Sequence, residues 1–163
     1  MLRLSHISRW AIVQTATNQT VADHTWRVWL LGHSWWQHAG LEPDEWHATE
    51  QYLLLHDIHE VRTGDMPTPH KTPELKILLD DYEEALAPGV AAMYKALTPR
   101  ARQFAKYCDT AESVLYLKVC GLGAHAADVT RLLEHQMLDR LQASDLPGKH
   151  VLHSLFTDAY HGT

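Results

Sequence analysis

The sequence is poor in cysteine and has neither a long hydrophobic run nor a surplus of positive charge. Its two cysteines, Cys108 and Cys120, stand in no CxxC or zinc-finger spacing, which excludes a disulfide framework and a cysteine-based metal site. Both lie in apolar stretches of helical character and are expected to be buried free thiols. No apolar run approaches the roughly 18 residues that a membrane-spanning helix needs, and the N-terminal stretch lacks the apolar core of a secretion signal. We therefore expect an intracellular protein with no membrane partner.

The charge balance argues against a nucleic-acid binder. The formal net charge is −6 with the histidines neutral, whereas proteins that bind a phosphate backbone are normally basic. A small phosphorylated substrate needs only a few local cations and stays compatible with this charge. The 13 histidines are either metal ligands or tolerated surface groups, so their positions have to decide.

Sustained period-two alternation is also missing, which predicts an all-α fold, a compact helical bundle. The chain has no repeat and no linker, so residues 1–163 are expected to form a single domain. Pro43, Thr72-Pro73 and Thr98-Pro99 have the pattern of helix starts, in which a capping residue precedes a first-turn proline. Thr63–Thr72 is too rich in glycine and proline to be regular and is expected to be a loop. Helices are predicted over about 4–13, 21–38, 43–61, 73–86, 88–97, 99–120, 126–143 and 147–160.

The first candidate for chemistry is the pair His56-Asp57, which follows three consecutive leucines. Burying a histidine and an aspartate without partners is costly, and a bound metal ion removes that cost. On a continuous helix over 43–61, Glu60 would project on the same side one turn later, beside the metal without binding it. His59 would point away from Asp57 on that helix.

Two further donors lie on other predicted helices. His24 follows Asp23 on a helix rich in tryptophan and leucine, and Asp109 lies on an apolar helix with Lys106 three residues before it. Two imidazoles and two carboxylates form a mixed donor set that suits Co²⁺, Mn²⁺, Fe²⁺ or Zn²⁺, with water in the remaining positions. A His-Asp pair alone is weak evidence, because a buried histidine bonded to a carboxylate gives the same pattern.

The order of several short motifs is more specific. They are Ser8-Arg9-Trp10, then VADHT over 21–25, then LHDIHEVRTGDMPTPHK over 55–71, then KYCDTAE over 106–112. This order resembles the HD-domain phosphohydrolases that act as 5′-deoxynucleotidases, from about residue 4 to about residue 120. The short chain and the Arg-Trp-x-Ile opening look more like the bacteriophage dATP triphosphohydrolases of the same superfamily. The resemblance implies an HD-domain helical bundle that hydrolyses the 5′ phosphoester of a deoxynucleotide. The favoured reaction converts dATP to deoxyadenosine and triphosphate, and the alternative is a 5′-deoxynucleotidase acting on deoxynucleoside monophosphates.

The resemblance also implies roles for individual residues. One catalytic divalent transition metal, Co²⁺, Zn²⁺ or Mn²⁺, would be bound by His24, His56, Asp57 and Asp109. Arg9 would hold a phosphate, Glu60 and Asp65 would flank the attacked phosphorus, and Trp10 would lie along the deoxyribose, where a 2′-hydroxyl would clash. Arg9, Glu60 and Asp65 are thus the expected catalytic residues.

Other residues are assigned to substrate binding from their chemistry. Lys71 and Lys106 would complete a set of cations, with Arg9, that suits a triphosphate better than a monophosphate. Trp10, Ile12 and Pro69 would form apolar walls around the sugar and base.

Several questions stay open from the sequence. Members of the resembled family are oligomers, so a homo-oligomer, a dimer or a hexamer, is expected, with the Trp-rich segment 21–38 as apolar surface. The expected compartment is the cytoplasm, or the host cytoplasm if a phage encodes the chain. A non-catalytic, metal-binding helical module is the alternative from a different class. A nuclease or signalling phosphodiesterase is disfavoured, since the chain is acidic and has no basic stripe.

Overall fold

The computed structural model describes residues 2–67 and 72–161, so two predicted substrate-binding residues, Pro69 and Lys71, lie outside the described part. The prediction of an all-α fold is confirmed, since the described residues form helices, two isolated β-bridges and no strand. No helix in these ranges is long and apolar enough to cross a membrane. In chain order the elements are a 3-10 helix, η1 (Leu2–His6), and the α-helices α1 (Val21–Trp35), α2 (Pro43–Leu55), α3 (Glu60–Thr63), α4 (Pro73–Leu86), α5 (Pro88–Ala96), α6 (Pro99–Cys120), α7 (Gly123–Ala143) and α8 (Lys149–His161).

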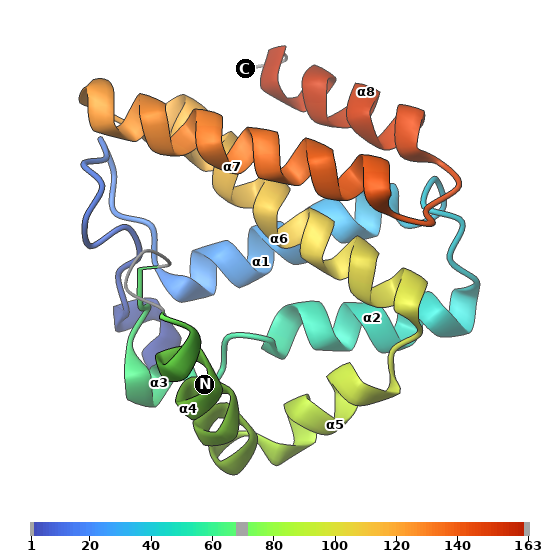
Figure 1. Ribbon diagram of the computed structural model, residues 1–163, viewed down its shortest axis with the longest axis horizontal. Helices are drawn as coiled ribbons and strands as arrows, with labels where there is room; N and C mark the ends of the chain where they lie inside the picture. The colour runs from blue at the N-terminus through green and yellow to red at the C-terminus, as the bar shows by residue number, and fades with distance from the viewer. Residues whose placement is uncertain (1, 68–71, 162–163) are drawn as a thin grey trace.

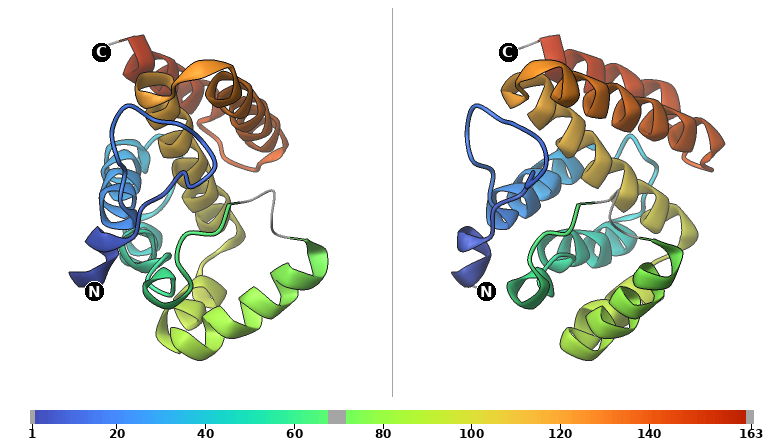
Figure 2. Two further views of the ribbon diagram at one scale, coloured as in Figure 1. Left: turned by 90° about the vertical axis from the view of Figure 1, so that its left-hand side faces the viewer. Right: turned by 60° about the vertical axis from the view of Figure 1, so that its left-hand side comes forward.

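Helix α6 is the centre of the molecule. It crosses the middle of the structure, with α7 and α8 on one side and α1 and α2 on the other, while α4 and α5 stand apart at the edge (Figures 1 and 2). Apolar residues from successive turns of α6, including Phe104, Cys108, Ala111 and Val114, are fully buried. Polar side chains on the same helix are therefore carried into the interior, and this positions the site.

The predicted helix starts are confirmed where a cap and a proline coincide. The Thr72 hydroxyl accepts a hydrogen bond from the Leu75 amide at 3.3 Å, and the Thr98 hydroxyl accepts one from Ala101 at 3.1 Å. In both helices the next residue is a first-turn proline, whose missing N–H would have had no partner there. Helices α7 and α8 begin at residues 123 and 149, within three residues of the predicted positions.

The predicted helix over residues 4–13 is wrong. The chain forms only η1 and then runs as an irregular segment to residue 20, paired by backbone with distant positions. The Arg9 amide donates to the Gln19 carbonyl at 2.8 Å, and the Val21 amide donates to Ile7 at 2.9 Å. Trp10 has a φ of 65°, in the left-handed region that no α-helix contains. These pairs occupy the Arg9 amide and the Ile7 carbonyl, two groups that a helix over 4–13 would have used.

The predicted helix over 43–61 is interrupted. Helix α2 ends at Leu55, a turn occupies residues 56–59, and the short α3 starts at Glu60. His59, predicted to point away from Asp57, is paired with a carboxylate of α4. His59 lines the same cavity as Asp57, and its Nε2 lies 2.9 Å from Glu83 Oε1. The turn at residues 56–59 changes the direction of the chain between α2 and α3, whereas a continuous helix would have kept the direction of α2.

Helix α1 also ends earlier than predicted, at Trp35, and the chain turns back at Gly40 with a φ of 67°. Glycine 32 lets α1 and α2 approach closely, since a Cβ there would lie 2.6 Å from Leu53 Cδ1. Both predicted thiols are free, but only Cys108 is fully buried, while Cys120 is partly exposed.

Candidate active site

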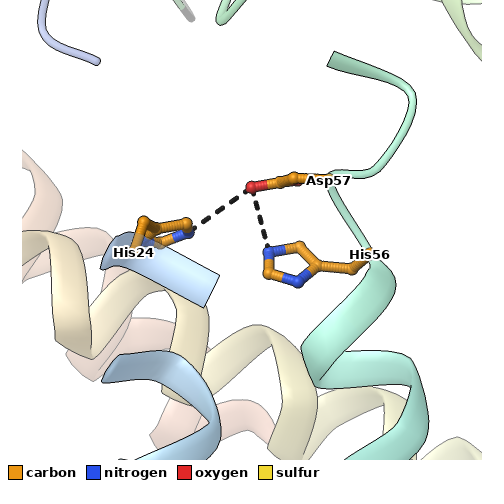
Figure 3. A group of neighbouring side chains, drawn as sticks. All are labelled: His24, His56 and Asp57. Atoms are coloured by element: carbon orange, nitrogen blue, oxygen red, sulfur yellow. Dashed lines mark ion pairs between the residues drawn. The ribbon is translucent and has the colours of Figure 1, made fainter. Parts of the chain in front are cut away.

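Four predicted metal ligands lie in one cluster. His24 projects from the first turns of α1, and His56 and Asp57 follow the end of α2 (Figure 3). Asp57 Oδ2 lies 3.2 Å from His56 Nε2 and 3.6 Å from His24 Nε2. Asp109, on α6, places Oδ1 3.2 Å from His24 Nε2. Side chains from three separate parts of the chain thus converge around His24, which is fully buried.

The far nitrogen of each imidazole is already hydrogen-bonded. His24 Nδ1 lies 2.6 Å from Glu112 Oε2, and His56 Nδ1 lies 2.8 Å from the Leu53 carbonyl oxygen. An ionised carboxylate and a carbonyl can only accept, so each Nδ1 carries a hydrogen and donates it. In a neutral ring this leaves the lone pair on Nε2. Both Nε2 atoms are buried, and the polar atoms that face them are the carboxylate oxygens of Asp57 and Asp109 at 3.2–3.6 Å.

This donor set fits a divalent transition ion. One ligand atom each from His24, His56 and Asp57 lies within 4.8 Å of the others. Ligand atoms at about 2.0–2.2 Å from a tetrahedral zinc are roughly 3.3–3.6 Å apart, close to the separations of 3.2–3.6 Å found here. Two imidazole nitrogens and a carboxylate are borderline ligands of the kind that zinc, cobalt and manganese accept.

The electrostatics of the cluster also favour a cation. Burial acts to lower the pKa of His56, but the charge and hydrogen bond of Asp57 and the charge of Asp109 raise it to about 9. Burial acts to raise the pKa of Asp57, yet the adjoining His56 and the charge of His24 hold it well below its usual range. Burial also acts to raise the pKa of Asp109. The charge of Lys106 and the hydrogen bond to His24 outweigh burial and hold that pKa well below its usual range. Both carboxylates are therefore ionised at neutral pH.

A cavity of about 540 Å³ opens beside the cluster, between α2, α4, α5 and α6. Small-molecule sites typically have this size. His56, Asp57 and Asp109 line it together with Glu60, which is only 7% exposed. Lys106 also lines it, and its Nζ lies 2.6 Å from Asp109 Oδ2, which confirms that these two side chains share one face of α6.

A second cavity, of about 360 Å³, adjoins the first. The two share the lining residues Tyr94, Arg102 and Lys106, and Arg140 from α7 joins them in the second cavity. The charged residues that line this second cavity are Arg102, Lys106 and Arg140, all of them cations. In a chain of net charge −6, such a wall provides a local site for an anion.

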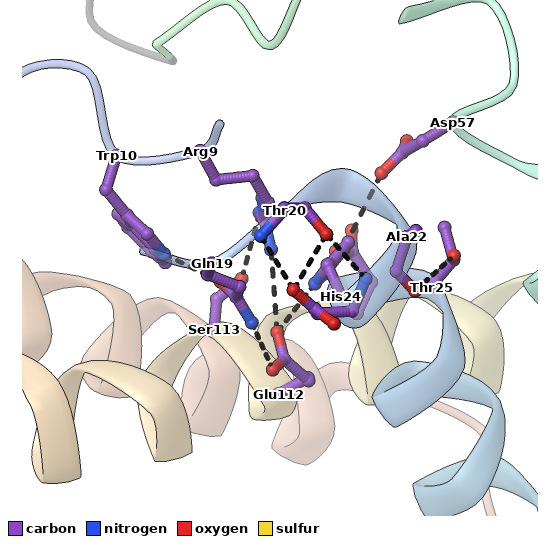
Figure 4. A network of polar contacts seen from close by, with 12 residues as sticks. Arg9, Trp10, Gln19, Thr20, Ala22, His24, Thr25, Asp57, Glu112 and Ser113 are labelled. Atoms are coloured by element: carbon purple, nitrogen blue, oxygen red, sulfur yellow. Dashed lines mark hydrogen bonds and ion pairs between the residues drawn. The ribbon is translucent and has the colours of Figure 1, made fainter. Parts of the chain in front are cut away.

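The N-terminal segment lies on the other side of His24 (Figure 4). Arg9 Nη1 is 3.5 Å from Glu112 Oε2, and Nη2 donates to the Ser113 hydroxyl at 3.3 Å. The Trp10 indole N–H donates to Gln19 Oε1 at 2.7 Å, and Gln19 Nε2 donates to Glu112 Oε1 at 2.6 Å. Glu112 thus contacts both a predicted metal ligand and the segment predicted to bind substrate.

Comparison with known proteins places this arrangement in a family. Residues 1–118 match the family described as 5′-deoxynucleotidase YfbR-like. The chain belongs to the YfbR-like family of HD phosphohydrolases. It is 54% identical over 145 residues to a dATP triphosphohydrolase of Cyanophage S-2L, covering 89% of this chain and 83% of that protein. It is 32% identical over 135 residues to a dATP triphosphohydrolase of Salmonella phage PMBT28, covering 77% and 68% of the two chains.

Solved structures agree with this YfbR-like assignment. The Cyanophage S-2L HD phosphohydrolase DatZ, bound to dA and one catalytic Zn²⁺ ion, superposes with a TM-score of 0.95 at 49% identity, covering 99% of this chain and 95% of that one. A metal-dependent phosphohydrolase from Magnetospirillum magnetotacticum has a TM-score of 0.64 at 17% identity, covering 98% and 87%. At that identity the second likeness shows the fold alone.

Within the YfbR-like fold, the other predicted site residues fall in different places. Arg9 and Trp10 are largely buried beside Glu112, whereas Ile12 is 40% exposed on the same N-terminal segment. Asp65 is partly buried in the loop after α3 and is not among the residues that line the 540 Å³ cavity. The structure therefore groups Glu60 and Lys106 with the metal cluster on the cavity side and Arg9 with Trp10 on the opposite side.

Two buried polar residues of the site were missed in the sequence, Gln19 and Glu112, each 2% exposed. Glu112 stands three residues after Asp109 on α6, one helical turn away. That spacing is a usable signal, because it places a second carboxylate on the face that carries a ligand. Gln19 gives no local signal, since its partners become neighbours only through the fold.

Proposed function

We propose that the chain is a metal-dependent phosphohydrolase that converts dATP to deoxyadenosine and triphosphate. The observation that carries this proposal is the convergence of two buried imidazole Nε2 atoms on the Asp57 carboxylate at the edge of a 540 Å³ cavity. The similarity to a phage dATP triphosphohydrolase, whose structure holds dA and one catalytic Zn²⁺, supports both the substrate and the ion.

In this proposal His24, His56 and Asp57 hold one Zn²⁺, Co²⁺ or Mn²⁺, and Asp109 completes the set. A bound divalent ion lowers the pKa of water from ~15.7 towards ~7 and polarises phosphoryl oxygens. The bond between the 5′ oxygen and the α-phosphorus breaks, and the oxygen of water joins the phosphorus. Glu60, buried in the cavity wall, orients that water and takes its proton, which is then returned to the leaving 5′ oxygen to give the 5′-hydroxyl of deoxyadenosine. Asp65 assists from the following loop.

The chain's cations act on the phosphate. Arg9 has five N–H donors and uses two of its nitrogens on Glu112 and Ser113, and in this proposal the remaining donors bind the α-phosphate. Lys106, beside Asp109, neutralises developing charge on the phosphoryl oxygens. Lys71, which lies outside the described residues, is proposed to add a further cation. Trp10, Ile12 and Pro69 form the apolar walls for the deoxyribose and base.

The second cavity favours a triphosphate over a monophosphate. A monophosphate needs charge neutralisation only at the metal, whereas the β- and γ-phosphates need room and cations beyond it. The 360 Å³ cavity lined by Arg102, Lys106 and Arg140 offers both, and it shares Lys106 with the catalytic cavity. Its lack of a carboxylate among the described lining residues removes the main source of repulsion.

We also propose a homo-oligomer, a dimer or hexamer, with residues 1–163 acting as one domain. An aromatic row on the outer face of α1 supports an interface: Trp26 is 55% exposed and stacks on Trp29, and Leu30 beside them is 47% exposed. The proposed compartment is the cytoplasm that contains the deoxynucleotide pool, the host cytoplasm if a phage encodes the chain.

A substrate panel tests the proposal. The purified protein, loaded with Zn²⁺ or Co²⁺, is incubated with dNTPs, NTPs and dNMPs, and products are identified by chromatography and ³¹P NMR. We expect deoxyadenosine and triphosphate from dATP, without dADP as an intermediate. Release of phosphate from monophosphates alone would replace this proposal with the 5′-deoxynucleotidase alternative.

The non-catalytic module is tested by the Glu60→Ala variant. It should retain one zinc per chain and lose hydrolysis, because Glu60 lines the cavity without belonging to the ligand cluster. A wild-type protein that binds zinc but turns over no deoxynucleotide would favour the module.

A further inference from the structure

The hydrogen bonds that surround Glu112 run in one direction. Trp10 Nε1 and Gln19 Nε2 can only donate, and the Glu112 carboxylate can only accept. The indole therefore fixes the Gln19 amide with its oxygen towards Trp10, at 2.7 Å, and its nitrogen towards Glu112, at 2.6 Å. The second carboxylate oxygen accepts from His24 Nδ1 at 2.6 Å. A continuous relay of three bonds joins the Trp10 ring to the metal ligand His24.

Trp10 needs to be held in place. Its φ of 65° is a left-handed conformation, which is strained for a bulky residue and persists only where the surrounding structure holds it. Its ring stacks on Tyr116 at 6.0 Å between centroids with planes 5° apart, and the Arg9 guanidinium lies 5.2 Å from its centroid. Gln19 accepts the hydrogen bond of the indole N–H, and Gln19 itself is 2% exposed and anchored on Glu112.

We propose that Gln19 and Glu112 are positioning residues that hold the Trp10 ring and the His24 imidazole in one rigid unit. This inference rests on the proposed function, in which Trp10 lies along the sugar and His24 holds the ion. The Glu112 carboxylate then serves two purposes. It helps the protein to select against a 2′-hydroxyl, through Trp10, and it supports metal binding, through His24. Neither Gln19 nor Glu112 needs to touch the substrate.

The direction of the bonds makes Glu112→Gln a sharp test. The new side chain keeps one accepting oxygen and turns the other atom into a donor. If the oxygen of the new side-chain amide accepts from His24, its nitrogen faces the Gln19 nitrogen, and two donors meet. A flip of the Gln19 amide relieves that conflict but places the Gln19 nitrogen against the Trp10 indole N–H, which is also a donor. If the oxygen of the new amide serves Gln19, the same conflict falls on His24 Nδ1. Either way one end of the relay loses its bond.

The experiment uses the full-length zinc-loaded protein with four variants: Gln19→Leu, Glu112→Gln, Trp10→Phe and the double variant W10F/E112Q. Thr49→Val is the matched control, because Thr49 is a fully buried polar residue of α2 whose hydroxyl bonds the Glu45 carbonyl outside the site. The measurements are kcat and KM for dATP and ATP, zinc affinity by chelator competition, and solvent exchange of the Trp10 indole N–H by ¹H–¹⁵N NMR.

We expect Gln19→Leu to lower the dATP-to-ATP ratio of kcat/KM at least tenfold and to speed indole exchange at least tenfold, with zinc affinity within threefold of wild type. Glu112→Gln should weaken zinc binding about 10–100-fold, the usual effect of removing a carboxylate behind a ligating histidine, and also lower the ratio. In the double variant the ratio should fall no further than in the worse single variant, because both changes act on one ring. Thr49→Val should alter stability alone.

Three results would overturn the inference: an unchanged ratio in Gln19→Leu, an indole that exchanges equally fast in wild type and variant, or losses that multiply in the double variant. Failure of the proposed function is separate, since it would appear as a wild-type protein without dATP hydrolysis, and the indole exchange and zinc affinity would still test the relay. A Gln19→Leu protein that does not fold leaves Glu112→Gln and Trp10→Phe to decide.

Discussion

Zinc binding should release a proton from His56, and the effect has a defined size. The neighbouring carboxylates raise the pKa of His56 from 6.5 to about 9, so without zinc the ring is protonated at neutral pH. A histidine ligand must be neutral, and zinc therefore displaces this proton. The apparent zinc affinity should rise about tenfold per pH unit between pH 6.5 and 9 and level off above that range.

The stability of zinc-free protein should change in the opposite direction. A folded-state pKa raised from 6.5 to about 9 corresponds to about 3 kcal/mol at ~1.36 kcal/mol per pKa unit. Because the pKa is raised, this stabilisation is complete below pH 6.5 and is lost as the pH climbs through 9. Urea unfolding of chelator-treated protein at pH 6.5, 7.5 and 8.5 should therefore show that the contribution of His56 to the free energy of unfolding declines. Over the same pH range the affinity of the protein for zinc should rise.

Calorimetric titration with zinc in two buffers of different ionisation enthalpy at pH 7.5 counts the released protons directly. We expect about one proton per zinc, with affinities taken from competition against a chelator. The control is His47→Asn, since the His47 side chain is 71% exposed and its loss should leave the count unchanged. An affinity that does not vary between pH 7 and 8.5, or a binding event without proton release, would refute the reasoning.

Three other changes have expected outcomes. Asp57→Asn removes the carboxylate that contacts both imidazoles, so zinc affinity measured by competition should fall at least ~100-fold and dATP hydrolysis should be lost with helical circular dichroism unchanged. Arg140→Ala removes a cation of the second cavity, so KM for dATP should rise severalfold while kinetics with dAMP change little, and equal losses for both would contradict the triphosphate site. Gly32→Ala places a Cβ 2.6 Å from Leu53 Cδ1, which should cost about 1–3 kcal/mol in urea unfolding. A neutral result would contradict the close fit of α1 against Leu53.

The parts of the fold that sequence predicts well are those decided within one helical turn. Thr72 and Thr98 cap their helices with their own hydroxyls, and the proline after each needs no distant partner. The same locality explains why Lys106 and Asp109 were placed on one face. A spacing of three residues within a single helix is enough for that prediction.

The failures involve partners far apart in sequence. The sequence predicts a helix over residues 4–13, but backbone pairing of Arg9 with Gln19 and of Ala16 with Cys120 holds residues 7–20 as an irregular segment. The turn at residues 56–59 is an exception, because local backbone bonds hold it, such as Ile58 N–H to the Leu55 carbonyl at 2.9 Å and Glu60 N–H to the Asp57 carbonyl at 3.0 Å. Apolar spacing does not distinguish such a turn from a continuous helix. Glu112 acquires its role from groups 88 to 103 residues earlier in the chain.

The central claim is that one divalent ion sits among His24, His56, Asp57 and Asp109. Diffraction from crystals grown with zinc and deoxyadenosine, recorded on both sides of the zinc absorption edge, tests it most directly. The account predicts a single strong anomalous peak about 2.0–2.2 Å from His24 Nε2, His56 Nε2 and the Asp57 carboxylate. A peak bound elsewhere, or zinc-saturated crystals with no peak between these side chains, would contradict it.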